Sequence, residues 1–273
     1  CTAWYSAASS PAWPAAAIQL AESFTSDKDA TGAALTSGTI QKYGTGTLKI
    51  ATAVSSPGLN FDVPTGQLTI NGTVGNVSLA SGAILGGSGT VGAVTTVSGA
   101  IIGPGNSPGT LTSSSVALVG GTDFEWQVQN ATGTAGVGYD TLTVTGALDV
   151  SGASSVNPIN LKVISLAGNG DGTALGNPLN FTASSIRTFT FATVGSLNLG
   201  ANTNISDAFT IDVSQFTYTD GSSSNAGLWS LSFADNAITL TAVPEPSTYG
   251  FGLGALALAA AAIRRRRKNQ PTV

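Results

Sequence analysis

The sequence predicts an all-β protein: a right-handed parallel β-solenoid, or β-helix, with a C-terminal β capping region and one short C-terminal transmembrane helix. Three observations predict it: a seventeen-residue repeat in the first half, strands of alternating polarity in the second half, and one uncharged apolar stretch near the C-terminus. The composition agrees, because 35 of 273 residues are Gly and only 9% are charged, which is typical of turn-rich β architectures. A hydrophobic fraction of 42% and a net charge of -4 argue against disorder.

The repeat is visible by direct alignment. Residues 72–88 align without gaps on residues 89–105, with ten identities in seventeen positions. Each unit holds short apolar stretches separated by Gly or Ser turns, so one unit alone cannot bury its apolar face. Stacking such units at a strand spacing of about 4.8 Å would line the apolar residues into a continuous interior.

The repeat also predicts which residues lie side by side. We expect residues 66–118 to form stacked parallel rungs, with Val74 near Val91 and Ile84 near Ile101 in the interior. A β-sandwich of antiparallel hairpins is the alternative, because turn signals every eight to twelve residues also permit it.

Two segments of this region carry a family resemblance. LGGSGTVG at 85–92 and GAIIGPGNSPGTL at 99–111 resemble the autotransporter-associated β-strand repeat of bacterial surface proteins, and residues 42–50 are similar to a further copy. GNSPGTL is the most specific part of the match, which spans residues 42–118. The export route of an autotransporter is not implied. In autotransporters an outer-membrane β-barrel follows the repeats, whereas here the C-terminal tail described below takes that position.

From about residue 122 the pattern changes to longer strands. Residues 123–129 alternate in polarity and place Phe124, Trp126 and Val128 on one face. Further strands are expected at 140–144, 161–166, 189–194, 229–233 and 237–242. We expect this region to cover the C-terminal end of the solenoid and protect its strand edges. The chain therefore divides into a poorly defined N-terminal fragment (1–41), solenoid repeats (42–121), a C-terminal β region (122–242) and a tail (243–268).

The composition excludes catalytic and metal sites that depend on histidine or on several cysteines. The chain contains no His, and Cys1 is its one cysteine, so a Ser-His-Asp triad, a zinc cluster and an internal disulfide are all excluded. We expect no catalytic residues, no metal and no cofactor. Residues 1–243 hold five bases against thirteen acids, a net charge of 5 − 13 = −8, which argues against a nucleic-acid partner.

Two patterns resemble binding sites but are better explained as ordinary turns. Gly87, Gly89 and Gly92 satisfy GxGxxG, but the residues that follow predict a strand rather than the helix that a dinucleotide site needs. We interpret these glycines as turn residues. Asn169–Gly172 resembles a calcium turn but supplies one carboxylate, whereas calcium takes six to eight oxygen ligands. A plain turn is the preferred interpretation.

Asp123 and Glu125 lie on the same face of one strand, with their Cα atoms about 6.7 Å apart. This spacing falls in the range of carboxyl separations found in glycosidases. A carbohydrate-active β-helix enzyme is therefore one alternative function. A polysaccharide-binding adhesin is another, because Trp126 and Trp229 could stack on sugars. We expect neither, because alternation is typical of a half-solvated strand and such tryptophans are more often in the core.

The C-terminal tail has three parts in a fixed order. Pro244 and Pro246 enforce an extended peptide that a protease cleft could hold. Residues 249–263 (YGFGLGALALAAAAI) are uncharged and would form about 22 Å of helix, a short membrane span. A basic cluster at 264–268 follows at once, and its long side chains can reach the membrane surface. Arginines retained in the cytoplasm would place the body outside that membrane.

This order of elements resembles the PEP-CTERM sorting signal of Gram-negative bacteria. The resemblance covers residues 243–268 and implies an exosortase, a membrane-embedded cysteine transpeptidase, as processing partner. The processing motif would be Val243, Pro244, Glu245, Pro246 and Ser247, and membrane retention would depend on Arg264, Arg265, Arg266 and Arg267. An ordinary tail anchor is the alternative.

The resemblance further implies an exported structural protein, held transiently in the inner membrane and then found at the cell surface or in an extracellular matrix with exopolysaccharide as a partner. Residues 1–25 show no signal peptide. Because a sorting tail presupposes export, we expect the sequence to be an N-terminally truncated fragment. The alternative is that Cys1 is the lipidated first residue of a mature lipoprotein.

Overall fold

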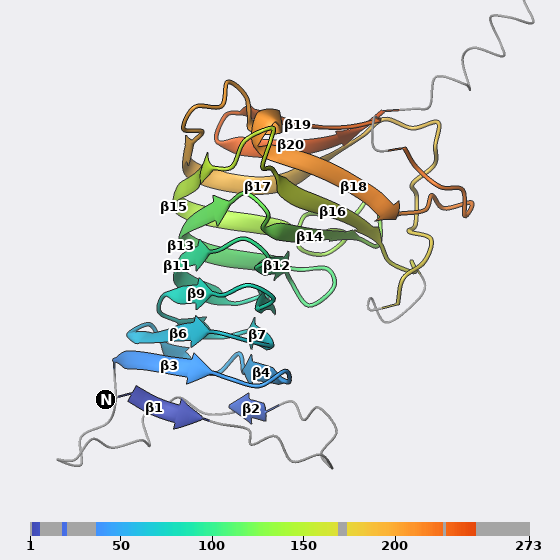
Figure 1. Cartoon of the computed structure of the whole chain (residues 1–273). Helices are drawn as coiled ribbons and strands as arrows, with labels where there is room; N and C mark the ends of the chain where they lie inside the picture. The colour runs from blue at the N-terminus through green and yellow to red at the C-terminus, as the bar shows by residue number, and fades with distance from the viewer. Residues whose placement is uncertain (1, 6–17, 21–36, 169–173, 226–227, 244–273) are drawn as a thin grey trace, which may run out of the picture.

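The computed structural model describes residues 2–5, 18–20, 37–168, 174–225 and 228–243, which form two β-sheets (Figure 1). The 12-stranded sheet contains, in spatial order, β1 (Thr2–Tyr5), β3 (Gly38–Lys42), β6 (Leu59–Val63), β9 (Val77–Leu79), β11 (Thr90–Thr96), β13 (Thr110–Val119), β15 (Thr141–Gly152), β17 (Arg187–Asn198), β20 (Ala237–Ala242) and β19 (Trp229–Ala234), with β5 (Ser55–Ser56) and β8 (Thr73–Val74) beside this path. The 8-stranded sheet contains β2 (Ile18–Leu20), β4 (Thr47–Ile50), β7 (Gln67–Ile70), β10 (Ile84–Gly87), β12 (Ile101–Pro104), β14 (Asp123–Val128), β16 (Ile159–Ser165) and β18 (Phe209–Gln215). Almost no helix accompanies them; the described residues include one short 3-10 helix, η2 (Ile205–Ala208).

Neighbouring strands are parallel through most of both sheets. From β9 to β18 successive strands fall alternately in the 12-stranded and the 8-stranded sheet, so the chain passes from one sheet to the other and back. Among the strands that the structure describes, β20 alone pairs antiparallel, with β17 on one side and β19 on the other. The predicted all-β class is confirmed, and the long parallel sheets are consistent with a β-solenoid rather than with a sandwich of hairpins.

The seventeen-residue repeat sets the register between strands. Ile84 lies opposite Ile101 in a parallel pair, and Thr73 lies opposite Thr90, which puts Val74 level with Val91. The predicted neighbours are therefore confirmed, and both valines are buried.

The predicted interior position of Ile84 and Ile101 is wrong. Both are only partly buried, on the outer face of the 8-stranded sheet, while their neighbours Leu85 and Ile102 are 0% and 1% exposed. Successive side chains of a strand point to opposite faces, so two adjacent apolar residues cannot both enter the interior.

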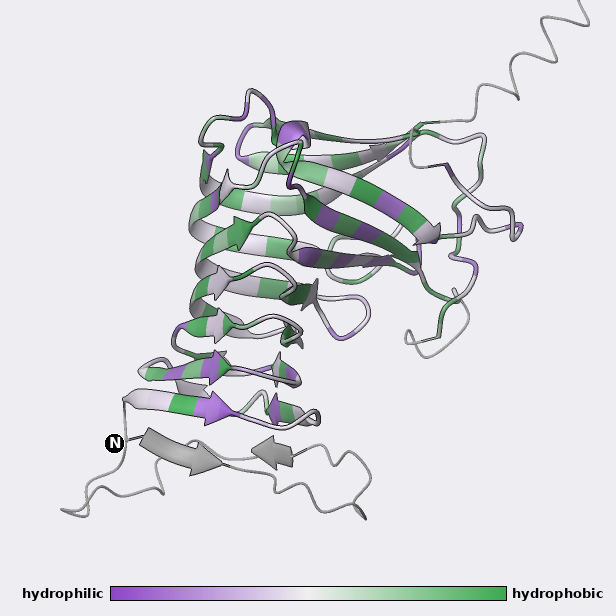
Figure 2. Cartoon of the chain, in the orientation of Figure 1, coloured by the Kyte–Doolittle hydropathy of each residue, from purple (hydrophilic) through white to green (hydrophobic). Residues whose placement is uncertain are grey.

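A column of large apolar residues runs through the 8-stranded sheet, one from each strand from β4 to β18. Its members are Leu48, Leu68, Leu85, Ile102, Phe124, Leu161 and Ile211, each opposite the next. Figure 2 shows the corresponding stripes of apolar and polar residues along the strands. The first six members are buried, whereas Ile211 in the last strand is partly exposed.

Several glycines are required where successive turns of the chain touch. Gly87 has a φ of 106°, and a Cβ at Gly87 would collide with the carbonyl of Ile70. A Cβ at Gly89 would collide with the carbonyl oxygen of Gly72. Gly87 is the last residue of β10, and Gly89 lies between β10 and β11. The residues that follow form strand β11 rather than a helix, as predicted, but the interpretation of all three glycines as turn residues is wrong, because Gly87 ends β10 and Gly92 lies within β11.

Residues 122–242 contain the predicted strands, but most of them extend the two sheets rather than cover their end. Strands β14 to β18 continue the parallel order, whereas in the described residues β20 pairs antiparallel with the edge of β17 and β19 pairs with β20. The region that covers the end of the 12-stranded sheet is thus smaller than predicted. Within the described residues no helix is long and apolar enough to cross a membrane; the predicted helix at 249–263 lies outside them.

Candidate functional site

The tail joins the body without a spacer. Strand β20 ends at Ala242, which lies opposite Trp229 in β19. The N–H of Val243 still donates a hydrogen bond to the carbonyl oxygen of Leu228 at 2.9 Å, and Val243 is 39% exposed. The first residue of the predicted processing motif is therefore held by the folded body. The remaining motif residues and the arginine cluster lie outside the described residues: Pro244, Glu245, Pro246, Ser247, Arg264, Arg265, Arg266 and Arg267.

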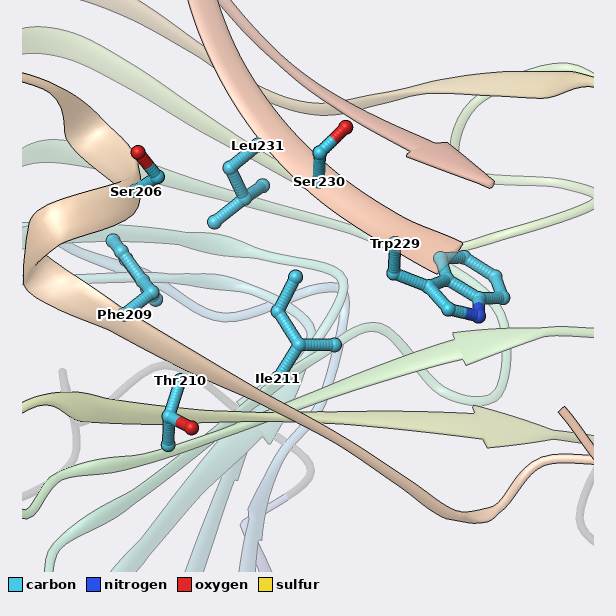
Figure 3. A pocket seen from close by; sticks show the side chains of 7 residues that line it. All are labelled: Ser206, Phe209, Thr210, Ile211, Trp229, Ser230 and Leu231. Carbon is cyan, nitrogen blue, oxygen red and sulfur yellow. The ribbon is translucent and has the colours of Figure 1, made fainter. Parts of the chain in front are cut away.

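A groove of about 360 Å³ lies next to this junction, between β18 and β19. Figure 3 shows its lining: Ser206, Phe209, Thr210, Ile211, Trp229, Ser230 and Leu231. Aromatic and aliphatic side chains reach it from both sheets, and hydroxyl groups accompany them. This groove could not be predicted from the sequence, because its two walls are separated by about twenty residues.

The wall of the groove at Trp229 is held by an aromatic cluster. The indole of Trp229 packs against Phe216 and Phe181, with ring centroids 5.1 Å and 5.6 Å apart. Its Nε1 donates a hydrogen bond to the Ser224 hydroxyl at 3.0 Å. Trp229 is 5% exposed and Trp126 is 0% exposed, so the core interpretation of both rings is confirmed. Neither offers an open face on which a sugar could stack.

The two carboxylates on β14 lie on the outer face of the 8-stranded sheet. Lys162 Nζ lies 2.7 Å from Asp123 Oδ2 and 3.9 Å from Glu125 Oε1. Asn160 Nδ2 donates to Asp123 Oδ1 at 2.9 Å. The sequence could not reveal these partners, because they come from β16 and depend on the register of β14 against β16.

These contacts shift the pKa values of Asp123 and Lys162. Partial burial raises the pKa of Asp123, but the hydrogen bonds from Lys162 and Asn160 outweigh it and hold that pKa below its ordinary value. The hydrogen bond to Asp123 likewise raises the pKa of Lys162. A glycosidase general acid needs a raised pKa, so Asp123 is poorly suited to that role.

Sequence reasoning missed a third carboxyl group, Asp140, which is fully buried. Its Oδ1 accepts from the N–H of Gly109 at 2.8 Å, and its Oδ2 from the N–H of Gln127 at 3.0 Å. Its main-chain oxygen accepts from Trp126 Nε1 at 2.6 Å. Burial raises the pKa of Asp140 well above its ordinary value, against the opposing effect of the two backbone hydrogen bonds. Asp140 thus ties the GNSPGTL segment to β14.

The part of the chain that the structure describes contains no group of three or more His, Cys, Asp or Glu side chains that could hold a metal ion. The sequence pattern considered for calcium, Asn169–Gly172, lies outside the described residues.

Comparison with known families gives a match at the tail. Residues 242–267 match the PEP-CTERM protein-sorting motif, which confirms the predicted resemblance to within one residue at each end. A search of curated proteins finds no match. The motif indicates that the chain is exported, sorted towards the cell surface and targeted by an exosortase.

Proposed function

We propose that this chain is a non-enzymatic structural protein of the cell surface or extracellular matrix. Its body is a right-handed parallel β-solenoid whose residues 42–118 are copies of the autotransporter-associated β-strand repeat. Its tail spans the inner membrane until an exosortase cuts it. The observation that carries the proposal is the PEP-CTERM motif at residues 242–267.

The charge of the tail supports transient retention in the membrane. Each arginine at mid-bilayer costs about 2.5–3.5 kcal/mol on insertion scales, and four occur in succession at 264–267. Export would therefore stall with residues 249–263 in the membrane and the Pro-Glu-Pro segment just outside it. Cutting there removes the span, so cleavage and release of the body are coupled.

The geometry of the body supports a structural role. Asp123 is paired with Lys162, and Asp140 is buried away from any surface. Within the described residues, no observation favours the carbohydrate-active enzyme, and the burial of both tryptophans weighs against the adhesin. A role beside exopolysaccharide follows from the sorting signal alone, and binding of the purified body to the producing organism's own polysaccharide would test it.

The decisive experiment is mass spectrometry of the mature surface protein from an exosortase-positive host. We expect a C-terminus between Val243 and Ser247. The control is a Pro244→Ala/Pro246→Ala chain, which should keep its tail. Recovery of peptides containing Phe251 or Ile263 from the mature wild-type protein would show that the tail is a permanent anchor.

A further inference from the structure

The two sheets end unevenly at the C-terminal end of the body. The 12-stranded sheet continues beyond β17 into β20 and β19, whereas the 8-stranded sheet, in the described residues, ends at β18. The apolar column therefore stops at Ile211, which is partly exposed and lies in the groove between β18 and β19 (Figure 3). The groove lies beside the first three residues of β18, Phe209, Thr210 and Ile211, where the 8-stranded sheet ends.

Strand β18 also has an unpaired edge. It pairs with β16 on one side, and no strand of the described residues pairs with its other side. Alternate backbone N–H and C=O groups on that side can pair with an added strand. An unpaired edge beside an apolar groove can accept an extended segment from another protein, whose alternate side chains enter the groove.

The charge on β18 disfavours a second copy of this chain as the occupant. Asp212 is exposed at the centre of Phe209–Gln215. Antiparallel pairing of two copies of β18 about this centre would place Asp212 opposite Asp212, and like charges directly opposite are destabilising. A strand with a basic residue opposite Asp212 is the better match.

The position of the groove points to the enzyme that processes the tail. Trp229 lines the groove and lies opposite Ala242, and Val243 is still hydrogen-bonded to Leu228. An enzyme that holds Pro244–Pro246 in its cleft must therefore touch the body beside the groove, because no spacer separates the motif from the fold.

We propose that the groove between β18 and β19 is a docking surface for the exosortase, which lays an extended segment along the edge of β18, with apolar side chains in the groove and a basic residue opposite Asp212. This inference rests on the proposed function. It makes the folded end of the body, and not only the tail, a determinant of cleavage.

The test compares cleavage of matched variants in an exosortase-positive host, by following loss of the tail after a pulse of synthesis. Thr210→Arg obstructs the groove from an exposed position, and Ile211→Thr removes its central apolar side chain. Thr95→Arg makes the same change as Thr210→Arg on an exposed site of β11, far from the groove. Thermal unfolding of each purified body verifies folding.

We expect cleavage of both groove variants to slow about five- to tenfold, a loss typical of an interface contact, while Thr95→Arg is cut like the wild type. Equal cleavage of all four chains, with the Pro244→Ala/Pro246→Ala chain uncut, would overturn the docking proposal and leave the proposed function intact. An uncut wild-type chain would overturn both.

Discussion

At the scale of single residues, Asp140 couples stability to pH. Its pKa is raised in the folded state from an ordinary value of 3.8, so between these two values the folded state binds more protons than the unfolded state. The free energy of unfolding should therefore fall as pH rises through that window. Asp140→Asn should remove this slope. Urea unfolding of both proteins from pH 4 to pH 8 measures it.

The same variant should be less stable than the wild type at acid pH. Its amide NH₂ must face the N–H of either Gly109 or Gln127, which leaves one donor without an acceptor at a cost of about 1–2 kcal/mol. The difference should shrink as the pH rises through the raised folded-state pKa of Asp140, above which the wild type carries a buried charge. Parallel pH profiles for the two proteins would show that Asp140 is not the responsible group.

Asp123 and Glu125 test the assignment to a non-enzymatic class. The double variant Asp123→Asn/Glu125→Gln removes the two carboxylates of β14 beside Lys162, whereas Asp212, opposite Lys162 in β18, remains. The ion pair between Lys162 and Asp123 is partly exposed and worth about 1 kcal/mol or less. We expect a small loss of stability and no loss of function. If the wild type degrades a polysaccharide and the double variant does not, the structural assignment is wrong.

At the scale of the strand, two neighbouring residues of β10 should behave very differently. Leu85 is 0% exposed within the apolar column, so Leu85→Ala should cost about 2–5 kcal/mol of unfolding free energy. Ile84 faces outward and is partly buried, so Ile84→Ala should cost clearly less. Chemical denaturation of the two variants provides the comparison. A larger loss at Ile84 would contradict the observed orientation of the strand.

The strands and their pairing could be predicted because each depends on a regular pattern. Clean alternation identified the buried face of β14, where Phe124, Trp126 and Val128 are all 0% exposed, and the seventeen-residue repeat identified the pairing of β10 with β12. Alternation failed at Ile84, because Ala83, Ile84 and Leu85 are all apolar and a run of this kind does not reveal its inward face.

At the scale of the whole molecule, the C-terminal end could not be predicted, because its contacts join segments that are far apart in the chain. Phe181 packs against Phe216, Tyr218 and Trp229, and the groove forms only where β18 and β19 meet. No local pattern encodes such a meeting. The sorting motif was predictable from sequence because it is one contiguous stretch, residues 242–267, which its residue order alone identifies.

With the tail spanning the membrane as proposed, the point where the chain leaves the body predicts how the uncut protein stands on the bilayer. The chain leaves the body at Val243, beside β19 and β20 (Figure 1), so this end should face the bilayer and the N-terminal strands should point away.

Strands β4 and β18 are six strand spacings apart in the 8-stranded sheet, or about 29 Å at about 4.8 Å each. Single cysteines at Ser214 in β18 and Lys49 in β4, in a Cys1→Ser/Pro244→Ala/Pro246→Ala chain, allow energy transfer to a membrane dye to be compared. Transfer should be stronger from position 214, because the absence of a spacer after Val243 keeps that end close to the membrane. Equal transfer from both positions would mean that the body lies flat or tumbles freely on its tail.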